Sequence, residues 1–315
     1  MQTQRRASIG TSVLNVGALT LSAVLLWTGC HKSEDPVSPL SSNDPATSAA
    51  LNAAASTGVA SALSVNDFGA ADQMGDMVHL TRLVPMPGPA VEILGRDDGV
   101  EVDSLVRSYD STSGWWTITL FRERSREDHF VEFHRTYQLQ FLDAAGSPLR
   151  STVVGTDTAT HLFFKIVDGR GVRSGEHGIR RLISLSGEWR VDGINGDSIT
   201  INTLDGGDYM RVEADTMNRH ETFRTSYSTL DLKFTDVTGP RGENLGGGGI
   251  TGGTISGTYH AIVTYQRDST TITTTIDRTI NITLAGDSAR FELGGKFFSS
   301  DLRSGDCHED ERRDH

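Results

Sequence analysis

The feature that most constrains this chain is a two-residue alternation of apolar and polar side chains, which dominates it from about residue 90 onward. In residues 131–141, Val, Phe, Tyr, Leu and Phe alternate with Glu, His, Thr and Gln. In residues 272–284, isoleucines and a leucine alternate with threonines and an asparagine. Successive side chains of a β-strand point to opposite faces of a sheet. The alternation therefore predicts strands with one buried face and one face in water.

Further strands are predicted between dipeptides that favour tight turns. These turn signals are Asp98-Gly99, Asp168-Gly169, Asp192-Gly193, Asn195-Gly196 and Asp205-Gly206. The additional strands are expected near residues 99–109, 114–123, 159–168, 178–191, 197–204, 208–215, 222–235, 254–267 and 288–298. No convincing amphipathic helix of ten or more residues interrupts this region, which argues against parallel βαβ units.

We therefore expect an all-β fold, an antiparallel meander of about ten to twelve strands that is barrel-like or a sandwich. A single flat open sheet of that size is disfavoured, because sheets twist and because their edges expose unpaired backbone groups. The chain of 315 residues is long enough to bury a sizeable core. We place the β-rich domain at residues 67–300, after an N-terminal signal and a disordered tether.

Two segments of the domain resemble each other and predict duplicated long hairpins. One starts at Phe121 and the other at Tyr265. In both, an arginine and an acidic residue follow the aromatic residue closely, and an Arg-Thr pair later opens an alternating run. Each run contains an arginine, Arg135 or Arg278, at a position where the alternation places apolar residues.

Arg135 and Arg278 are the candidate ligand-binding residues of the chain. Their parity directs both side chains toward the apolar face of the sheet. In one explanation, the strand runs past the edge of the core there, or the arginine pairs with an acid from a neighbouring strand. In the other, the two arginines line a cavity that holds a hydrophobic or anionic small ligand. Both explanations stay open at the level of the sequence.

The N-terminus has the layout of a secretory signal. Arg5 and Arg6 form a basic head, and the apolar stretch from Ser12 to Trp27 spans 16 residues. A membrane-crossing helix needs ~20 apolar residues, so this stretch is short for a membrane span. Charged residues follow from Lys32 onward. A basic head, a short apolar centre and small residues before a cut are typical of a cleaved signal.

The end of this stretch, Leu26-Trp27-Thr28-Gly29-Cys30, resembles the lipobox of bacterial lipoprotein precursors. Thr28, Gly29 and Cys30 match the usual pattern, whereas Trp27 stands where the family usually has leucine. The resemblance covers only about the first 30 residues. It implies a signal peptide over 1–29, lipid attachment at Cys30 and a membrane partner reached through the lipid. The implied location is the bacterial cell envelope, at the outer membrane, facing either the periplasm or the surface.

Flanking segments are expected to be disordered. Residues 30–66 are predicted as a flexible linker, since they are rich in small and polar residues. Residues 46–64 form a helix in an equally open alternative, with Pro45 as its first residue. Residues 301–315 are predicted as a charged, disordered tail. The chain has two cysteines, so a lipid on Cys30 would leave Cys307 without a partner in the chain.

The net charge and the missing catalytic motifs argue against several classes of function. The formal net charge of −12 argues against binding to nucleic acid. The chain has no Gly-x-Ser-x-Gly elbow, and His220-Glu221 is followed by Arg224 where a zinc protease has its second histidine. We therefore predict no catalytic residues, no metal site and no cofactor. The expected function is a non-catalytic envelope module for ligand binding or scaffolding, and the alternative is an envelope hydrolase with a site assembled across strands.

Overall fold

The computed structural model describes residues 45–65, 69–83, 91–93, 100–126, 129–176, 178–219, 222–241, 249–267 and 269–310. These residues form two helices and seventeen strands. The helices are α1 (Pro45–Leu63) and α2 (Ala70–Leu83). The strands are β1 (Val91–Ile93), β2 (Val100–Asp110), β3 (Trp115–Arg126), β4 (His129–Leu142), β5 (Pro148–Leu149), β6 (Val153–Val154), β7 (Asp157–Thr158), β8 (His161–Gly175), β9 (Gly178–Asp192), β10 (Ser198–Thr203), β11 (Tyr209–Arg219), β12 (Thr222–Pro240), β13 (Gly252–Arg267), β14 (Thr270–Ala285), β15 (Ser288–Leu293), β16 (Lys296–Asp301) and β17 (Cys307–Glu309).

Fifteen of these strands form one antiparallel sheet, which confirms the predicted all-β meander. Neighbours in sequence are mostly neighbours in the sheet, and β1 and β17 are the two ends of the path among the described strands. The strand count exceeds the predicted ten to twelve partly because β1, β5 and β17 are very short. The strand predicted over 288–298 is wrong in one respect: Gly294 and Gly295 form a turn that divides it into β15 and β16.

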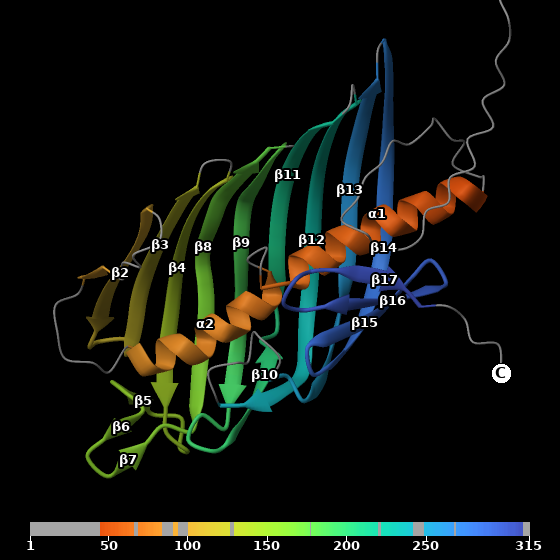
Figure 1. The fold of residues 1–315 in the computed structure, drawn as a ribbon. Helices are drawn as coiled ribbons and strands as arrows, with labels where there is room; N and C mark the ends of the chain where they lie inside the picture. The colour runs from red at the N-terminus through yellow and green to blue at the C-terminus, as the bar shows by residue number, and fades with distance from the viewer. Residues whose placement is uncertain are drawn as a thin grey trace, which may run out of the picture.

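The sheet curves around the two helices, which lie across its concave face (Figure 1). Three register shifts interrupt the pairing of the long strands, at Thr136/Tyr137, at Val212/Glu213 and at Thr235/Thr238. An extra residue in one strand bends that strand and increases the local twist. Asp168-Gly169 lies inside β8, beside the first of these shifts, so its prediction as a turn is wrong.

Helix α1 occupies part of the predicted linker, and the helical alternative for that segment is confirmed. From residue 51 onward the helix is buried on nearly all sides, which explains why its sequence has no amphipathic pattern. The hydroxyl groups of this segment donate hydrogen bonds to backbone carbonyls three or four residues earlier. Ser56 and Thr57 both donate to the carbonyl of Ala53, and Ser64, directly after the helix, donates to that of Ser61. Small residues thus let the helix lie deep in the curved sheet.

Gly58 marks the closest approach of α1 to the sheet. A Cβ atom added at this glycine would lie 2.5 Å from the hydroxyl oxygen of Tyr259 on β13 and 2.9 Å from the adjacent ring carbon. A glycine within a helix usually costs about 1 kcal/mol relative to alanine. Here it makes room for an aromatic ring, and burial raises the pKa of the Tyr259 phenol to about 12.

Helix α2 was not predicted, although its sequence carries a helical signal. Ala70, Met74, Met77 and Val78 recur at the spacing of one helix face, and all four are buried. The helix has 14 residues and comes shortly before the first alternating strand in the sequence. Its signal of period 3.6 is therefore brief beside the long signal of period two that follows. It places two aspartates, Asp72 and Asp76, over β4.

The C-terminal segment is ordered as far as residue 310, so the predicted disorder is wrong for residues 301–310. Strand β17 pairs with β16, and the backbone N–H of Val65 donates to the carbonyl of Leu302 at 2.8 Å. Cys307 is only 5% exposed and is disulfide-bonded. The structure therefore differs from the expectation that Cys307 has no partner when Cys30 carries lipid. Cys30 and residues 311–315 lie outside the described residues.

Candidate functional site

The most unusual side chain on the concave face is Arg135, which is completely buried. Its Nη1 atom lies 2.9 Å from Oδ2 of Asp72 and 2.8 Å from Oδ2 of Asp76, both on α2. Its guanidinium also lies over the ring of Phe133, 3.7 Å from the ring centroid. A buried charge is tolerated only when it is paired and hydrogen-bonded. The explanation by pairing therefore holds for Arg135, but the acids come from a helix and not from a neighbouring strand.

Asp76 is the centre of this buried cluster. It accepts a hydrogen bond from Arg135 and a short one from the hydroxyl of Tyr137, and Nη2 of Arg122 lies 3.9 Å from its second oxygen. Burial raises the pKa of the Tyr137 phenol well above its ordinary value, and Asp76 raises it further against the opposing effect of Arg135. Tyr137 therefore stays a neutral donor to the carboxylate. We call Arg135, Asp72, Asp76, Tyr137 and Arg122 the α2 charge cluster.

Arg278 lies on the same face, at the other end of the sheet, and is only partly buried. Its Nε atom donates to Oδ1 of Asn52 on α1 at 2.8 Å, and its Nη1 atom donates to the carbonyl of Asp277 at 2.8 Å. The sequence therefore placed both arginines on the helix-facing side correctly. The structure does not bring them together, and a ligand-binding role for either one stays a prediction.

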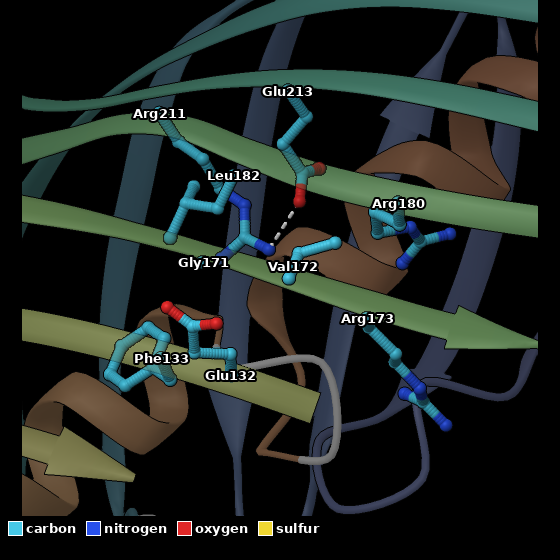
Figure 2. Close-up of a pocket in the computed structure, with 9 residues that line it drawn as sticks. All are labelled: Glu132, Phe133, Gly171, Val172, Arg173, Arg180, Leu182, Arg211 and Glu213. Carbon is cyan, nitrogen blue, oxygen red and sulfur yellow. Dashed lines mark hydrogen bonds and ion pairs between the residues drawn. The ribbon is translucent and has the colours of Figure 1, made fainter. Parts of the chain in front are cut away.

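A small hollow opens on the concave face beside the α2 charge cluster (Figure 2). Nine residues line it: Glu132, Phe133, Gly171, Val172, Arg173, Arg180, Leu182, Arg211 and Glu213. Figure 2 shows Arg211 and Glu213 joined across one side of it, with Nη2 and Oε1 2.5 Å apart. Its cavity volume of 20 Å³ is roughly that of one water molecule. Neither Arg135 nor Arg278 lines this hollow.

Arg180 connects two strands of this part of the sheet to α1. Nε of Arg180 on β9 lies 3.1 Å from Oδ1 of Asp215 on β11, and Arg180 also forms a short hydrogen bond with the hydroxyl of Ser61. Burial raises the pKa of the Asp215 carboxyl, and the charge of Arg180 opposes that increase. The polar groups around the hollow therefore hold helices and strands together.

Two histidine–carboxylate pairs lie on the outer surface of the sheet. Nδ1 of His161 lies 2.5 Å from Oδ1 of Asp192, and Nδ1 of His260 lies 2.5 Å from Oδ1 of Asp277. No serine or cysteine contact to either ring is found in the part of the chain that the structure describes. No group of three metal-ligating side chains occurs in that part either.

A comparison with protein-family models, with curated proteins and with solved structures finds no match for this chain. Neither of the two described helices has the length and apolar character that a membrane span requires.

Sequence reasoning found Arg135 but missed its partners. Asp72 and Asp76 are four residues apart, so they lie on one face of a helix and can reach the same cation. That spacing, together with an arginine predicted to face the core, could have indicated that Asp72 and Asp76 pair with Arg135. Arg211 and Glu213 were also missed, although their parity on β11 places both on the buried side of the strand.

Proposed function

We propose that this chain is a membrane-anchored envelope lipoprotein, attached through lipid on Cys30, whose β-domain serves as a non-catalytic scaffold or binding module. The observation that carries the proposal is Thr28-Gly29-Cys30 directly after an apolar stretch of 16 residues that is short for a membrane span. Each buried CH₂ of an acyl chain contributes about 0.8 kcal/mol, and two or more chains give stable attachment.

The filled concave face supports a scaffold over a carrier of small ligands. Helices α1 and α2 lie across the concave face (Figure 1), and large side chains of the strands, including Trp189, Phe164 and Phe234, are buried. The hollow in Figure 2 is too small for a lipid or a drug-sized ligand. Such a domain offers its outer surface and its sheet edges to other macromolecules.

The state of Cys30 decides the attachment, because a sulfur that carries lipid cannot also form a disulfide. The structure gives Cys307 a disulfide, and the chain contains two cysteines. The proposed lipid-bearing form is therefore one in which Cys307 is not paired with Cys30, because lipid on Cys30 and a Cys30–Cys307 disulfide exclude each other within one molecule. We expect bacteria that express the chain with radiolabelled palmitate to label it. The Cys30→Ser variant should lose the label, and the matched Cys307→Ser variant should keep it.

The mature N-terminal peptide provides the second readout. Mass spectrometry of the unreduced protein should find this peptide starting at Cys30 with added acyl mass. A peptide pair joined through Cys30 and Cys307, or a mature chain that starts elsewhere without lipid, contradicts the proposed attachment.

The role of the domain is tested separately. Purified protein is extracted with organic solvent, and the extract is analysed by mass spectrometry. A scaffold predicts an empty extract and no turnover in a broad screen of esters and glycosides. A stoichiometric co-purifying lipid contradicts the scaffold and supports a carrier, whereas turnover that survives repeated purification supports the hydrolase.

A further inference from the structure

Strand β14 has a long edge that no described strand covers. It pairs with β13 over its whole length, from Thr270↔Arg267 to Thr283↔Thr254. On its other side β15 pairs only with Asn281–Ala285. Residues 270–280 therefore present one open edge among the described strands, and Figure 1 shows this part of β14 rising beyond β15. An open edge of this length is a template for another strand.

The backbone groups that face this edge can be identified. Ala285 and Ser288 close a hairpin with two residues between them, and such a closing pair exchanges backbone hydrogen bonds. Because backbone groups alternate along a strand, those of the odd-numbered residues of β14 point to the same side as Ala285. The side-chain hydrogen bond from Arg278 to the carbonyl of Asp277 agrees with this assignment. Thr271, Thr273 and Thr275 thus direct their N–H and C=O groups to the open edge.

The part of this edge at residues 270–276 lacks the features that keep other sheet edges from pairing, whereas Asp277 and the inward-facing Arg278 follow it. Proteins commonly protect an edge with lysine, proline, inward-pointing charges or a bulge. Residues 270–276 read TTITTTI, without charge, proline or bulge. At the other end of the sheet, β2 carries Arg107 and Asp110, and β1 covers its centre.

The sequence of the edge is also self-complementary. Residues 272–276 read ITTTI and are palindromic about Thr274. In an antiparallel pair centred on Thr274, Ile272 lies opposite Ile276 of the second copy, and Thr273 lies opposite Thr275. Odd-numbered residues, whose backbone N–H and C=O groups face the open edge, then lie opposite odd-numbered residues of the second copy. Two strands can exchange hydrogen bonds only in such a register. Asp277 and Arg278 fall opposite threonines, so no like charges meet.

We propose that β14 is a dimerisation edge, at which a second copy of this chain adds its own β14 antiparallel across a two-fold axis at Thr274. The contact would join the two sheets into one. An isologous contact of this kind closes at the dimer, because each edge satisfies the other. The chemistry is strand addition, in which main-chain hydrogen bonds supply affinity and the isoleucine pairs supply register.

The test uses the chain as it is isolated from the expressing bacteria, in detergent. Its mass in solution is measured by light scattering and by sedimentation over a range of concentrations. The unmodified chain should have twice the monomer mass. The double variant Thr273→Lys/Thr275→Lys places lysines opposite lysines and should raise the dissociation constant roughly ten-fold or more. Asn281→Lys is the matched control, since it is exposed on the same strand but its edge is covered by β15. This control should stay dimeric.

Three further variants test the geometry. Thr275→Pro removes one N–H that faces the open edge while leaving the hydrogen bonds to β13, and it should abolish the dimer. Thr274→Cys places two thiols at the axis and should give a covalent dimer on mild oxidation, above the level of the unmodified chain. Thr275→Cys should not. Circular dichroism and thermal unfolding establish that each variant is folded.

The proposal is overturned by a monomeric unmodified chain, or by a folded Thr275→Pro variant that dimerises as well as the original. Failure of Thr274→Cys to cross-link within an intact dimer overturns the proposed register. None of these outcomes depends on whether Cys30 carries lipid, because Cys30→Ser can be compared in the same assay.

Discussion

The two long hairpins, β3–β4 and β13–β14, present the same departure from alternation and resolve it differently. Arg135 on β4 is completely buried and neutralised by two carboxylates of α2. Arg278 on β14 is half-buried and binds a neutral amide, Asn52 of α1, and a backbone carbonyl. An equivalent arginine in an equivalent strand therefore needs different partners, depending on how completely the helix above it excludes water.

The comparison shows how each helix is held to the sheet. At α2, full charges are removed from water, so each one depends on all the others. At α1, contact is made through small residues and through hydrogen bonds of Asn52 and Ser61 to arginines of the sheet, while Arg278 retains access to solvent. We expect the α2 end to be sensitive to any change of charge and the α1 end to be sensitive mainly to changes of volume.

The largest expected difference is in the loss of stability when Arg135 or Arg278 is replaced by leucine. Arg135→Leu leaves two carboxylates without their buried cation and should lower the free energy of unfolding by about 3–5 kcal/mol. Arg278→Leu, the matched control, loses one hydrogen bond to Asn52 and should cost about 1 kcal/mol. Denaturant unfolding of both variants measures the contrast. Equal costs would contradict the distinction between the two ends.

Within the α2 charge cluster, the two aspartates should be unequal. Asp76→Ala removes the acceptor of both Arg135 and Tyr137 and should cost about 3 kcal/mol. Asp72→Ala removes one ion pair and should cost about half as much, because its side chain is more exposed, 14% against 8%. Double-mutant cycles with Tyr137→Phe provide the measurement. Additive costs would show that Asp76 is not the centre of the cluster.

At the α1 end, Gly58→Ala should destabilise the protein by about 1–3 kcal/mol, although alanine favours a helix. The added methyl group would meet the ring of Tyr259. The pair Gly58→Ala/Tyr259→Phe removes the hydroxyl and should recover part of the loss, which thermal unfolding can measure. A stabilising Gly58→Ala would mean that α1 has room above β13.

Asn52→Ala should have a smaller effect, about 1 kcal/mol, since Arg278 can hydrogen-bond to water instead. Asn52 itself is buried, and a Cβ on Gly294 would lie 2.4 Å from its Nδ2 atom. Asn52→Asp gives the informative comparison, because it restores an acceptor and adds a charge. Chemical denaturation of the two variants should therefore rank them apart.

The smallest expected effect is a change in pH dependence. Burial and the neighbouring Asp76 raise the pKa of the Asp72 carboxyl above its ordinary value of 3.8 in the folded chain. The folded protein therefore binds a proton at a higher pH than the unfolded chain does. The contribution of Asp72 to stability rises as pH falls through the folded pKa toward 3.8. Asp72→Asn lacks this titration, so the original chain should gain stability relative to the variant on acidification.

The sequence predicted the strands well because alternation is a local signal. Residues 131–141 and 272–284 carry it almost without interruption, and β4 and β14 cover them. The parity of Arg135 and Arg278 was read correctly for the same reason. The helices that cover the apolar face come from residues far from these strands in the sequence. Asp72 is 63 residues from Arg135, and Asn52 is 226 residues from Arg278, so neither partner can be read from strand periodicity.

Helix α1 was ambiguous for a different reason. A helix that is buried on all sides shows no polar face, and its alanine, serine and threonine residues are also typical of a linker. The curved sheet supplies the surroundings that make those small residues useful. Composition alone therefore cannot separate a tether from a helix that is enclosed by strands made later in the chain.

The position of α1 has a consequence for the order of folding during synthesis. This helix is among the first described residues to be made, yet it contacts β13 to β17. Directly after the helix, Ser64 lies beside Gly305, and the backbone N–H of Val65 donates to the carbonyl of Leu302. An early segment that is completed only by the last strands must wait for nearly the whole chain, and such long-range closure is slow. A nascent chain that ends before β15 would lack three of the strands that contact α1, so this helix is fully covered only after β17 has been made.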